Sequence, residues 1–557
     1  MYGLMVFKSY KMKKLTLVLL LVSSLVFGNR IKNDSIRPKL EKIKVIYGQP
    51  PAIQFSVNPL TINENLPEKP FAGEVFPGAV GYGAYWTFPT DYQVRKVTTL
   101  ADGTGTGTFR WATSQPNTIV VFEVAGYIDV NKDAYGYLSI ASNVYVAGQT
   151  AFRYGGQGIT IRRSHAWSGP NLLTASNTIH RFYRVRTGSW NDPDCCGDAF
   201  TAAYGTNIIF DHMEMSYTSD ETVDFTDSNN VTVQWSILNE PLSNQPGSGG
   251  KTMQGNGRDQ SYAYNIFANS VQRNPALSPF RFANRSGLHN YEYVNNHGFN
   301  LNSWGLIFND NEDGAYIHAN IIGNTWQRPS NVPSPRRWIV MDDNPSTNRY
   351  YVSEDNYDSA YRPIGTTGGD VWNEITSRND DYANGMSTPL SKSYQVLTPY
   401  SMPMIANGSA IYDGDTLEEN VFPFVGTYQH RDASTTRLFN QLASNTGHTG
   451  LTSGNITSVS YFGTGYSNLN GMSGVEADSD GDGIPNSLEA TWGDDTFGYV
   501  NSLVDGSVPP PTPTCSDGIQ NGDETGIDCG GSCAPCSAPA TGNQTNKGKK
   551  NNTIIWW

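Results

Sequence analysis

The chain has 557 residues, and its 38 Lys and Arg against 51 Asp and Glu give a net charge of −13. This balance argues against duplex nucleic acid as the main partner, because a nucleic-acid-binding surface is positively charged. Aromatic residues make up 12% of the chain and charged residues only 16%, with 56 glycines, a composition that disfavours disorder and suits a β-rich globular protein.

The N-terminus has the pattern of an export signal. Lys11, Lys13 and Lys14 precede an apolar run over residues 15–27, which ends near small residues. The run is too short to span a bilayer, so we interpret residues 1–28 as a secretory signal peptide. We therefore expect a secreted protein, extracellular or on the cell surface, with no membrane span. Residues 29–71 would form an N-terminal leader.

Short β-branched or aromatic segments then recur at irregular intervals of about two dozen residues. No helical pattern separates them, which predicts a solenoid of stacked coils, a parallel β-helix, over residues 72–470. Asparagines at the turns would bond their counterparts in neighbouring coils. A β-sandwich also uses many short strands, but hairpin signals between these segments are scarce. The segments are 118–122, 143–146, 158–161, 178–182, 207–210, 230–233, 261–264, 289–293 and 315–318.

Three aspartates in this region predict a metal site. Asp198 and Asp220 are 22 residues apart, about one coil, so they are expected above one another on one face. The two-residue period of a strand places Asp220, Thr222 and Asp224 on the outer side. Stacked carboxylates of this kind suit Ca²⁺. Asp220 and Asp224 would be about 13 Å apart on a straight strand, so either the strand bends or more than one ion binds; a solvated acidic face is the alternative.

Two basic residues continue the same register. Lys251 lies 31 residues after Asp220, and Arg273 lies 22 residues after Lys251. In an acidic chain, a lysine and an arginine beside a carboxylate cluster predict a site that binds a polyanion through calcium and cation together. Arg281 and Arg285 follow closely. Scattered surface charges are the alternative interpretation.

A second calcium signal lies in residues 471–508. A twelve-residue loop there has acids at positions 1, 3, 5 and 12 and glycine at position 6, the spacing of an EF-hand-type loop. Pro485 departs from the helical EF-hand pattern, which favours a loop of the thrombospondin-repeat or dockerin kind with a structural role. The expected ligands are Asp478, Asp480, Asp482 and Glu489.

The chain ends in a Pro-rich linker, residues 509–514, and a Cys-rich tail, residues 515–557. Four cysteines occur within 22 residues of this tail. In an exported protein we expect two disulfides rather than a zinc site, and the spacing leaves the pairing open. These cysteines are Cys515, Cys529, Cys533 and Cys536.

An ordered set of motifs covers residues 72–300: 72–83 (AGEVFPGAVGYG), 97–100, 105–115, 119–128, 146–149, 207–212 and 264–275, with a weaker match at 425–432. Together they resemble the pectate lyases of polysaccharide lyase family 1. The resemblance implies an all-β, right-handed parallel β-helix. It also implies Ca²⁺-dependent cleavage of polygalacturonate (pectate) by β-elimination, which gives unsaturated oligouronides.

Site residues follow from the same resemblance. Asp198, Asp220 and Asp224 match calcium-ligand positions. Arg273 matches the arginine assigned as the catalytic base, and Lys251 matches a lysine that binds the substrate carboxylate.

This chain departs from the family pattern at two of these places. Cys196 stands where the family often has a further acid, with Asp194 as a substitute. Ser278 stands where a second arginine usually follows, and Arg281 is the nearest replacement as a substrate-binding residue.

Two other functions suit the same solenoid. A glycoside hydrolase would use two carboxylates as acid and base, and a non-catalytic carbohydrate-binding protein would use neither. In each case the expected partner is an acidic polysaccharide, bound by a monomer, with no nucleic acid involved.

Overall fold

The computed structural model describes the central part of the chain. The predicted signal peptide, leader, calcium loop, linker and Cys-rich tail lie outside the described residues, as does Arg281. Along the described ranges, no helix combines the length and apolar character needed to cross a membrane. The described residues are 73–76, 78–89, 92–154, 158–163, 170, 172–187, 197–242, 250–279, 286–301, 304–308, 314–331, 339–341, 346–360, 362–366, 370–377, 389–428 and 430–447.

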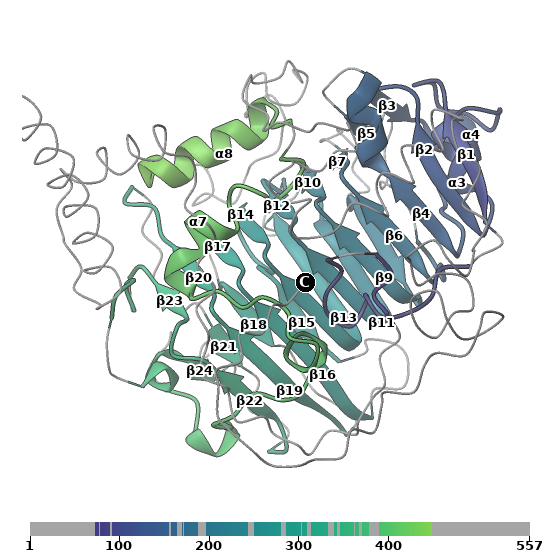
Figure 1. The fold of residues 1–557 in the computed structure, drawn as a ribbon. Coiled ribbons are helices and arrows are strands. Elements are labelled where there is room, and N and C mark those ends of the chain that lie inside the picture. The colour runs from purple at the N-terminus through teal and green to yellow at the C-terminus, as the bar shows by residue number, and fades with distance from the viewer. Residues whose placement is uncertain are drawn as a thin grey trace, which may run out of the picture. The chain divides into compact units, whose positions relative to one another are not determined.

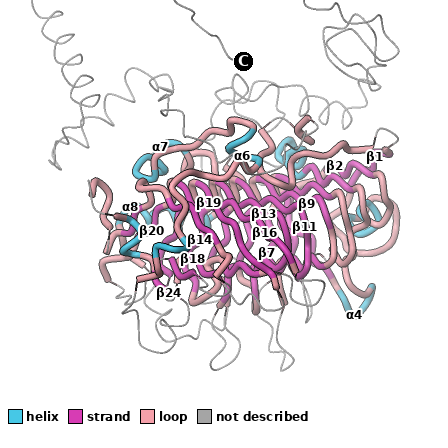
Figure 2. The backbone as a smooth tube through the Cα atoms, turned by 90° about the horizontal axis from the view of Figure 1, so that it is seen from below, coloured by secondary structure: helices cyan, strands magenta, loops and turns pink. Residues whose placement is uncertain are grey.

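The described strands form two long sheets whose members pair in parallel (Figures 1 and 2). The fifteen-stranded sheet contains β1 (Gln93–Val97), β2 (Thr118–Phe122), β4 (Val144–Ala147), β6 (Thr178–Arg181), β8 (Phe200–Ala203), β9 (Thr206–Asp211), β11 (Glu221–Gln234), β13 (Lys251–Ala263), β15 (Ala276–Ser278), β16 (Gly287–Val294), β18 (Leu306–Phe308), β19 (Ala315–Ile322), β21 (Ile339–Met341), β22 (Arg349–Val352) and β24 (Thr376–Ser377). The nine-stranded sheet contains β3 (Gly126–Val130), β5 (Ile159–Arg163), β7 (Arg184–Arg186), β10 (Glu214–Ser216), β12 (Ile237–Asn239), β14 (Ile266–Ser270), β17 (His297–Leu301), β20 (Thr325–Gln327) and β23 (Tyr357–Asp358).

The chain passes repeatedly from one sheet to the other, and each strand pairs in parallel with a strand of a neighbouring coil, so each coil stacks on the previous one. The prediction of a right-handed parallel β-helix is confirmed. The helices are short: α3 (Phe109–Thr113), α4 (Lys132–Tyr135), α6 (Pro403–Ala406), α7 (Leu417–Asn420), α8 (Ala433–Ser444), and the 3₁₀ turns η1 (Gly148–Tyr154), η2 (Val371–Glu374), η3 (Lys392–Tyr394) and η4 (Gly414–Thr416).

The core is built from rows of inward side chains in register from coil to coil. One such row crosses nine strands of the large sheet, and each member is less than 9% exposed. Because the strands pair in parallel and in register, residues of similar shape stack directly on one another. The row is Val120, Val146, His180, Phe210, Val233, Tyr262, Tyr293, Ile321 and Val352.

A ladder of asparagines runs along one turn of the solenoid, as the sequence predicts. Each side-chain amide donates to the side-chain oxygen of its counterpart in the preceding coil, over 2.7–3.0 Å. All members have φ between +49° and +59°, a left-handed conformation that asparagine tolerates better than most residues. The ladder fixes the position of the turn in every coil. Its members are Asn117, Asn143, Asn177, Asn207 and Asn230.

Two segments from outside the solenoid cover the outer face of the large sheet. The backbone N–H of Tyr82 donates to Ser261 Oγ over 3.0 Å. Ser261 Oγ in turn donates to Glu292 Oε2 over 2.6 Å, and the N–H of Met404 donates to Glu292 Oε1 over 3.0 Å. Glu292 is therefore a buried acid that holds both covering segments against β13 and β16.

Replacing Glu292 with glutamine is expected to stabilise the protein above neutral pH. Burial raises the pKa of Glu292 to about 7, against the lowering effect of its contacts with Ser261 and Met404. A raised pKa in the folded state means that stability falls as pH rises from about 4.3 through 7, by about 4 kcal/mol at most. The neutral amide mimics the protonated acid. In urea unfolding, the stability of the variant relative to wild type should rise by roughly 2–3 kcal/mol between pH 5 and pH 8. The same relative stability at the two pH values would contradict this account.

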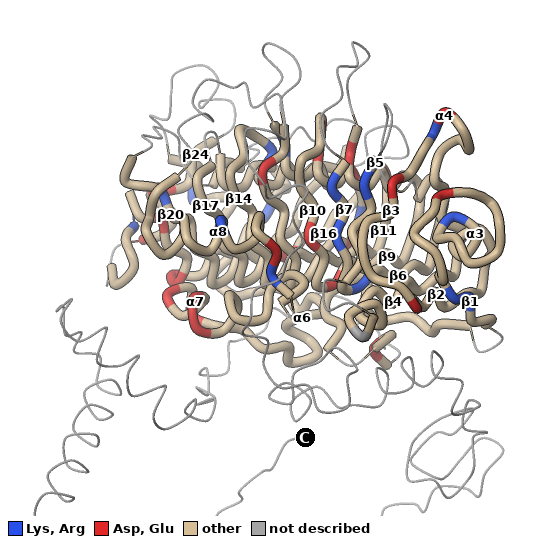
Figure 3. Tube along the Cα trace, turned by 90° about the horizontal axis from the view of Figure 1, so that it is seen from above, with Lys and Arg blue, Asp and Glu red and all other residues tan. Residues whose placement is uncertain are grey.

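The C-terminal clasp, residues 427–437, binds to the nine-stranded sheet through buried charges. Glu214 of β10 accepts hydrogen bonds from Arg184 of β7 at 2.9 Å, from Arg186 at 3.1 Å and from Thr435 at 2.7 Å. Asp432 bonds Arg186 and also accepts from the N–H groups that begin α8. Figure 3 marks the basic residues of β7 in blue. Two arginines and two carboxylates thus neutralise one another inside the protein.

Candidate active site

The predicted site residues lie at one edge of the large sheet, where four neighbouring strands begin. Asp198 precedes β8, Asp220 precedes β11, Lys251 is the first residue of β13 and Arg273 precedes β15. β8, β11, β13 and β15 are hydrogen-bonded in that order. Because parallel strands in register begin at the same edge, residues far apart in sequence come together there.

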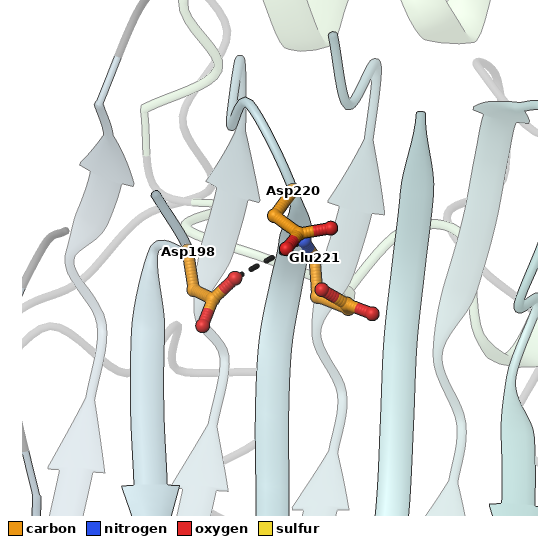
Figure 4. Close-up of side chains that lie close together, drawn as sticks. All are labelled: Asp198, Asp220 and Glu221. Atoms are coloured by element: carbon orange, nitrogen blue, oxygen red, sulfur yellow. Dashed lines mark hydrogen bonds between the residues drawn. The ribbon is translucent and has the colours of Figure 1, made fainter. Parts of the chain in front are cut away.

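Three carboxylates form the centre of this site. Single oxygens of Asp198, Asp220 and Glu221 lie within 4.8 Å of one another, and Figure 4 shows the three side chains converging. Asp198 accepts from the backbone N–H of Glu221 over 3.1 Å and from the hydroxyl of Thr201 over 2.8 Å. Burial and then the charges of Asp224 and Asp220 raise the pKa of Asp198. A cation among these oxygens would offset that repulsion.

Asp224 occupies a different position from the one expected for a shared ligand. It lies within β11, in register with Thr201 of β8 and Gln254 of β13, and accepts from Thr226 Oγ1 over 2.9 Å. Its oxygens are not among those that lie within 4.8 Å of one another, in the part of the chain that the structure describes. Its charge still acts on Asp198.

Glu221 is the acid that the sequence analysis missed. It has the same strand parity as the buried Val223, so alternation predicts that it points into the core. Glu221 is indeed only 3% exposed, but as the first residue of β11 it is buried against the charged side chains of Lys251 and Arg273 and not among apolar core residues. The adjacent pair Asp220–Glu221 was the available signal. Thr222, expected on the outer side, is fully buried, and its hydroxyl bonds the carbonyl of Thr252.

The two predicted cations bind these carboxylates directly. Lys251 Nζ forms an ion pair with Asp220 and lies 3.8 Å from Glu221 Oε1. Arg273 donates through one terminal nitrogen to both Glu221 and Gln254. The side chain of Arg273 is 34% exposed, so its guanidinium group is within reach of a ligand from solvent.

The donor set fits a hard divalent cation. With Asp224, four carboxylates face two cationic side chains, which leaves the site negative. Carboxylate oxygens are the ligands that Ca²⁺ prefers. Asp198, Asp220 and Glu221 converge closely enough to bind one ion together. The other predicted site residues lie outside the described residues; they are Arg281, Asp478, Asp480, Asp482 and Glu489.

Comparison with known proteins adds independent information on ancestry. No family model matches the chain. A probable pectate lyase C from Aspergillus fumigatus is 31% identical over 422 residues, which cover 75% of this chain and 87% of the relative. Its counterpart from Aspergillus flavus is 30% identical over 449 residues, covering 78% and 94%.

Among solved structures, a pectate lyase from Bacillus sp. N165 in complex with trigalacturonate superposes with a TM-score of 0.34 at 13% identity. That match covers 63% of this chain and 98% of the other. The curated relatives match at 30% identity or more over at least three quarters of this sequence. The chain therefore belongs to the pectate lyase family and is a polysaccharide lyase.

Proposed function

We propose that this protein is a secreted, Ca²⁺-dependent lyase that cleaves polygalacturonate by β-elimination and releases unsaturated oligouronides. The observation that carries the proposal is the convergence of Asp198, Asp220 and Glu221 with Lys251 and Arg273 at one sheet edge. The names of the curated relatives support the same substrate. The export pattern of residues 1–28 supports secretion.

The reaction removes the proton on C5 of a uronate and breaks the C4–O bond, which leaves a C4=C5 double bond on one sugar. The departing oxygen takes up a proton and becomes a hydroxyl group of the released sugar. The C5 proton is weakly acidic because the neighbouring carboxylate is already negative. Ca²⁺ held by Asp198, Asp220 and Glu221, with the negative charge of Asp224 nearby, would act as a Lewis acid that spreads this charge. Lys251, only 15% exposed, adds a fixed positive charge that binds the substrate carboxylate and stabilises the carbanion.

Arg273 is the proposed base. An arginine has a pKa above about 12. The alternative assigns carbanion stabilisation to Arg273 and proton removal to Lys251 or hydroxide. Both versions need Arg273 at the reacting carbon, and its exposure at the site edge supports that position.

Formation of products that absorb ultraviolet light is the test of the proposed reaction. Elimination creates a conjugated double bond, whereas a hydrolase would create new reducing ends without that absorbance. A binding protein would retain the polymer without cleaving it. Purified protein should therefore be incubated with polygalacturonate and other polyuronides, and both signals followed. Reducing ends without absorbance would overturn the proposal.

Removal of calcium is expected to abolish cleavage. Chelation with EDTA should lower the rate at least about 100-fold, because the four carboxylates lose the ion that offsets their repulsion, and added Ca²⁺ should restore it. Asp220→Asn should raise the Ca²⁺ concentration needed for half-maximal activity. Asp480→Asn, in the separate predicted loop, is the matched control and should leave that concentration unchanged. Full activity in EDTA would contradict the metal requirement.

A further inference from the structure

Three neutral side chains beside the site form a chain of hydrogen bonds that ends at Arg273. Gln254 and Asn256 lie two residues apart on β13, and they alternate with Met253 and Gly255, which face the core. Ser278 of β15 is the register partner of Asn256. Gln254, Asn256 and Ser278 are each 9% exposed or less, which is unusual for amide and hydroxyl groups unless they are hydrogen-bonded.

The donors and acceptors of the side chains fix the direction of these hydrogen bonds. An arginine side chain has only donors, so Gln254 must turn its carbonyl oxygen towards Arg273. The Gln254 amide nitrogen then donates to Asn256 Oδ1. The Asn256 amide nitrogen is left to donate to Ser278 Oγ, and it also lies 3.5 Å from the carbonyl of Pro279. Each amide therefore has one orientation that satisfies both of its neighbours.

We infer that Gln254 and Asn256 are positioning residues for Arg273, and we name the set Ser278–Asn256–Gln254 the amide relay. Without Asn256, the Gln254 amide nitrogen loses its acceptor, so the Gln254 side chain is no longer fixed from behind and its carbonyl oxygen can move away from Arg273. Gln254 and Glu221 bind the same terminal nitrogen of Arg273. Losing the neutral acceptor would therefore turn the guanidinium plane towards Glu221 and away from its present orientation.

The inference rests on the proposed function, in which Arg273 acts at the reacting carbon, and it predicts a particular kinetic pattern. The relay touches Arg273 rather than the proposed calcium ligands Asp198 and Asp220, so its loss should lower kcat and leave KM unchanged. A small displacement of a catalytic group can lower a rate by about 100-fold. A purely structural role would instead lower stability while leaving kcat of the folded fraction intact.

Two substitutions at Asn256 separate these possibilities. Asn256→Leu removes both hydrogen bonds and should lower kcat by about 10- to 100-fold. Asn256→Asp keeps an acceptor for the Gln254 amide nitrogen and can accept from the Ser278 hydroxyl, so it preserves the orientation of Gln254 and should retain kcat within about threefold of wild type. Asn290→Leu is the matched control. Asn290 of β16 lies outside the site and donates to Asp259 over 2.7 Å, so the kcat of this variant should be unchanged.

A second measurement follows the Arg273 side chain without relying on turnover. In protein labelled with ¹⁵N-arginine, the Arg273 guanidinium signals can be identified by their loss in Arg273→Lys. Restricted rotation of the terminal nitrogens should be seen in wild type and Asn256→Asp and lost in Asn256→Leu. Gln254→Met, which removes the acceptor at similar volume, should match Asn256→Leu and serves if that variant does not fold.

The outcomes distinguish the two proposals. Wild-type protein that yields no unsaturated product overturns the proposed function, and the relay is then judged by the guanidinium signals alone. Wild-type kcat together with unchanged Arg273 signals in folded Asn256→Leu or Gln254→Met overturns the relay. Reduced kcat in Asn256→Leu, retained in Asn256→Asp, with the corresponding change in rotation, supports it.

Discussion

Replacing Arg273 with alanine is expected to lower kcat for polygalacturonate cleavage by about 10³-fold, within the range found when a group that acts on the reacting proton is removed. The guanidinium group lies against Glu221 and Gln254 at the start of β15, and the neighbouring Lys251 is engaged with Asp220. The rate of appearance of unsaturated product at saturating polymer measures the effect. KM should change much less, because Lys251 and the carboxylates remain.

A matched arginine on the same sheet provides the control. Arg258 lies on β13, outside the site, and donates to the carbonyl of Ser286 over 2.8 Å; Arg258→Ala should cleave at the wild-type rate. Arg273→Lys separates the two mechanistic versions, since lysine keeps the positive charge and has a lower pKa than arginine. If Arg273 is the base, the pH–rate profile of that variant should shift to lower pH. Wild-type turnover by Arg273→Ala would remove Arg273 from the chemistry.

Replacing Glu214 with glutamine is expected to lower the free energy of unfolding by about 3–5 kcal/mol, the usual cost of removing one partner of a buried ion pair. Glu214 is 2% exposed and faces Arg184 and Arg186. Burial alone would raise its pKa, but the two arginines outweigh burial and lower the pKa to about 2. A lowered pKa in the folded state contributes stability above about pH 4.3 that is lost as pH falls towards 2. Denaturant unfolding at pH 7 and pH 3 should show a smaller difference between wild type and variant at pH 3.

An exposed ion pair is the control for this prediction. Asp129 bonds Arg162 over 2.8 Å, but its side chain is 49% exposed. Pairs of this kind contribute about 0–1 kcal/mol, so Asp129→Asn should unfold almost as wild type does. Equal destabilisation by the two substitutions would show that the buried charges contribute no more than surface ones.

The fold could be predicted because its physical requirements repeat along the chain. Each coil needs short branched or aromatic strands and a turn residue that accepts positive φ. Asn143, Asn177 and Asn207 supply that turn, and their ladder confirms the expected stacking. The spacing of 22 residues between Asp198 and Asp220 likewise indicated one coil, and the structure brings their oxygens together.

Other features of the site could not be read from spacing alone. Strand alternation assigns inner and outer sides only within a strand, and Glu221 is the first residue of β11, where the backbone leaves the turn. Asp224 lies further along the same strand, so strand geometry separates its carboxylate from the group formed by Asp198 and Asp220. The contacts of Gln254 depend on the exact register of β13 against β15, which the irregular coil lengths conceal.

The contacts of the C-terminal clasp could not be predicted from the sequence either, since Arg186 and Asp432 are 246 residues apart. The clasp also has a consequence for biosynthesis. In most repeat arrays each unit is complete once its neighbour has been translated. Here the arginines of β7 emerge from the ribosome long before Asp432. Until then, Arg184 and Arg186 have Glu214 but lack Asp432, so this part of the solenoid reaches its final state after the clasp has been synthesised.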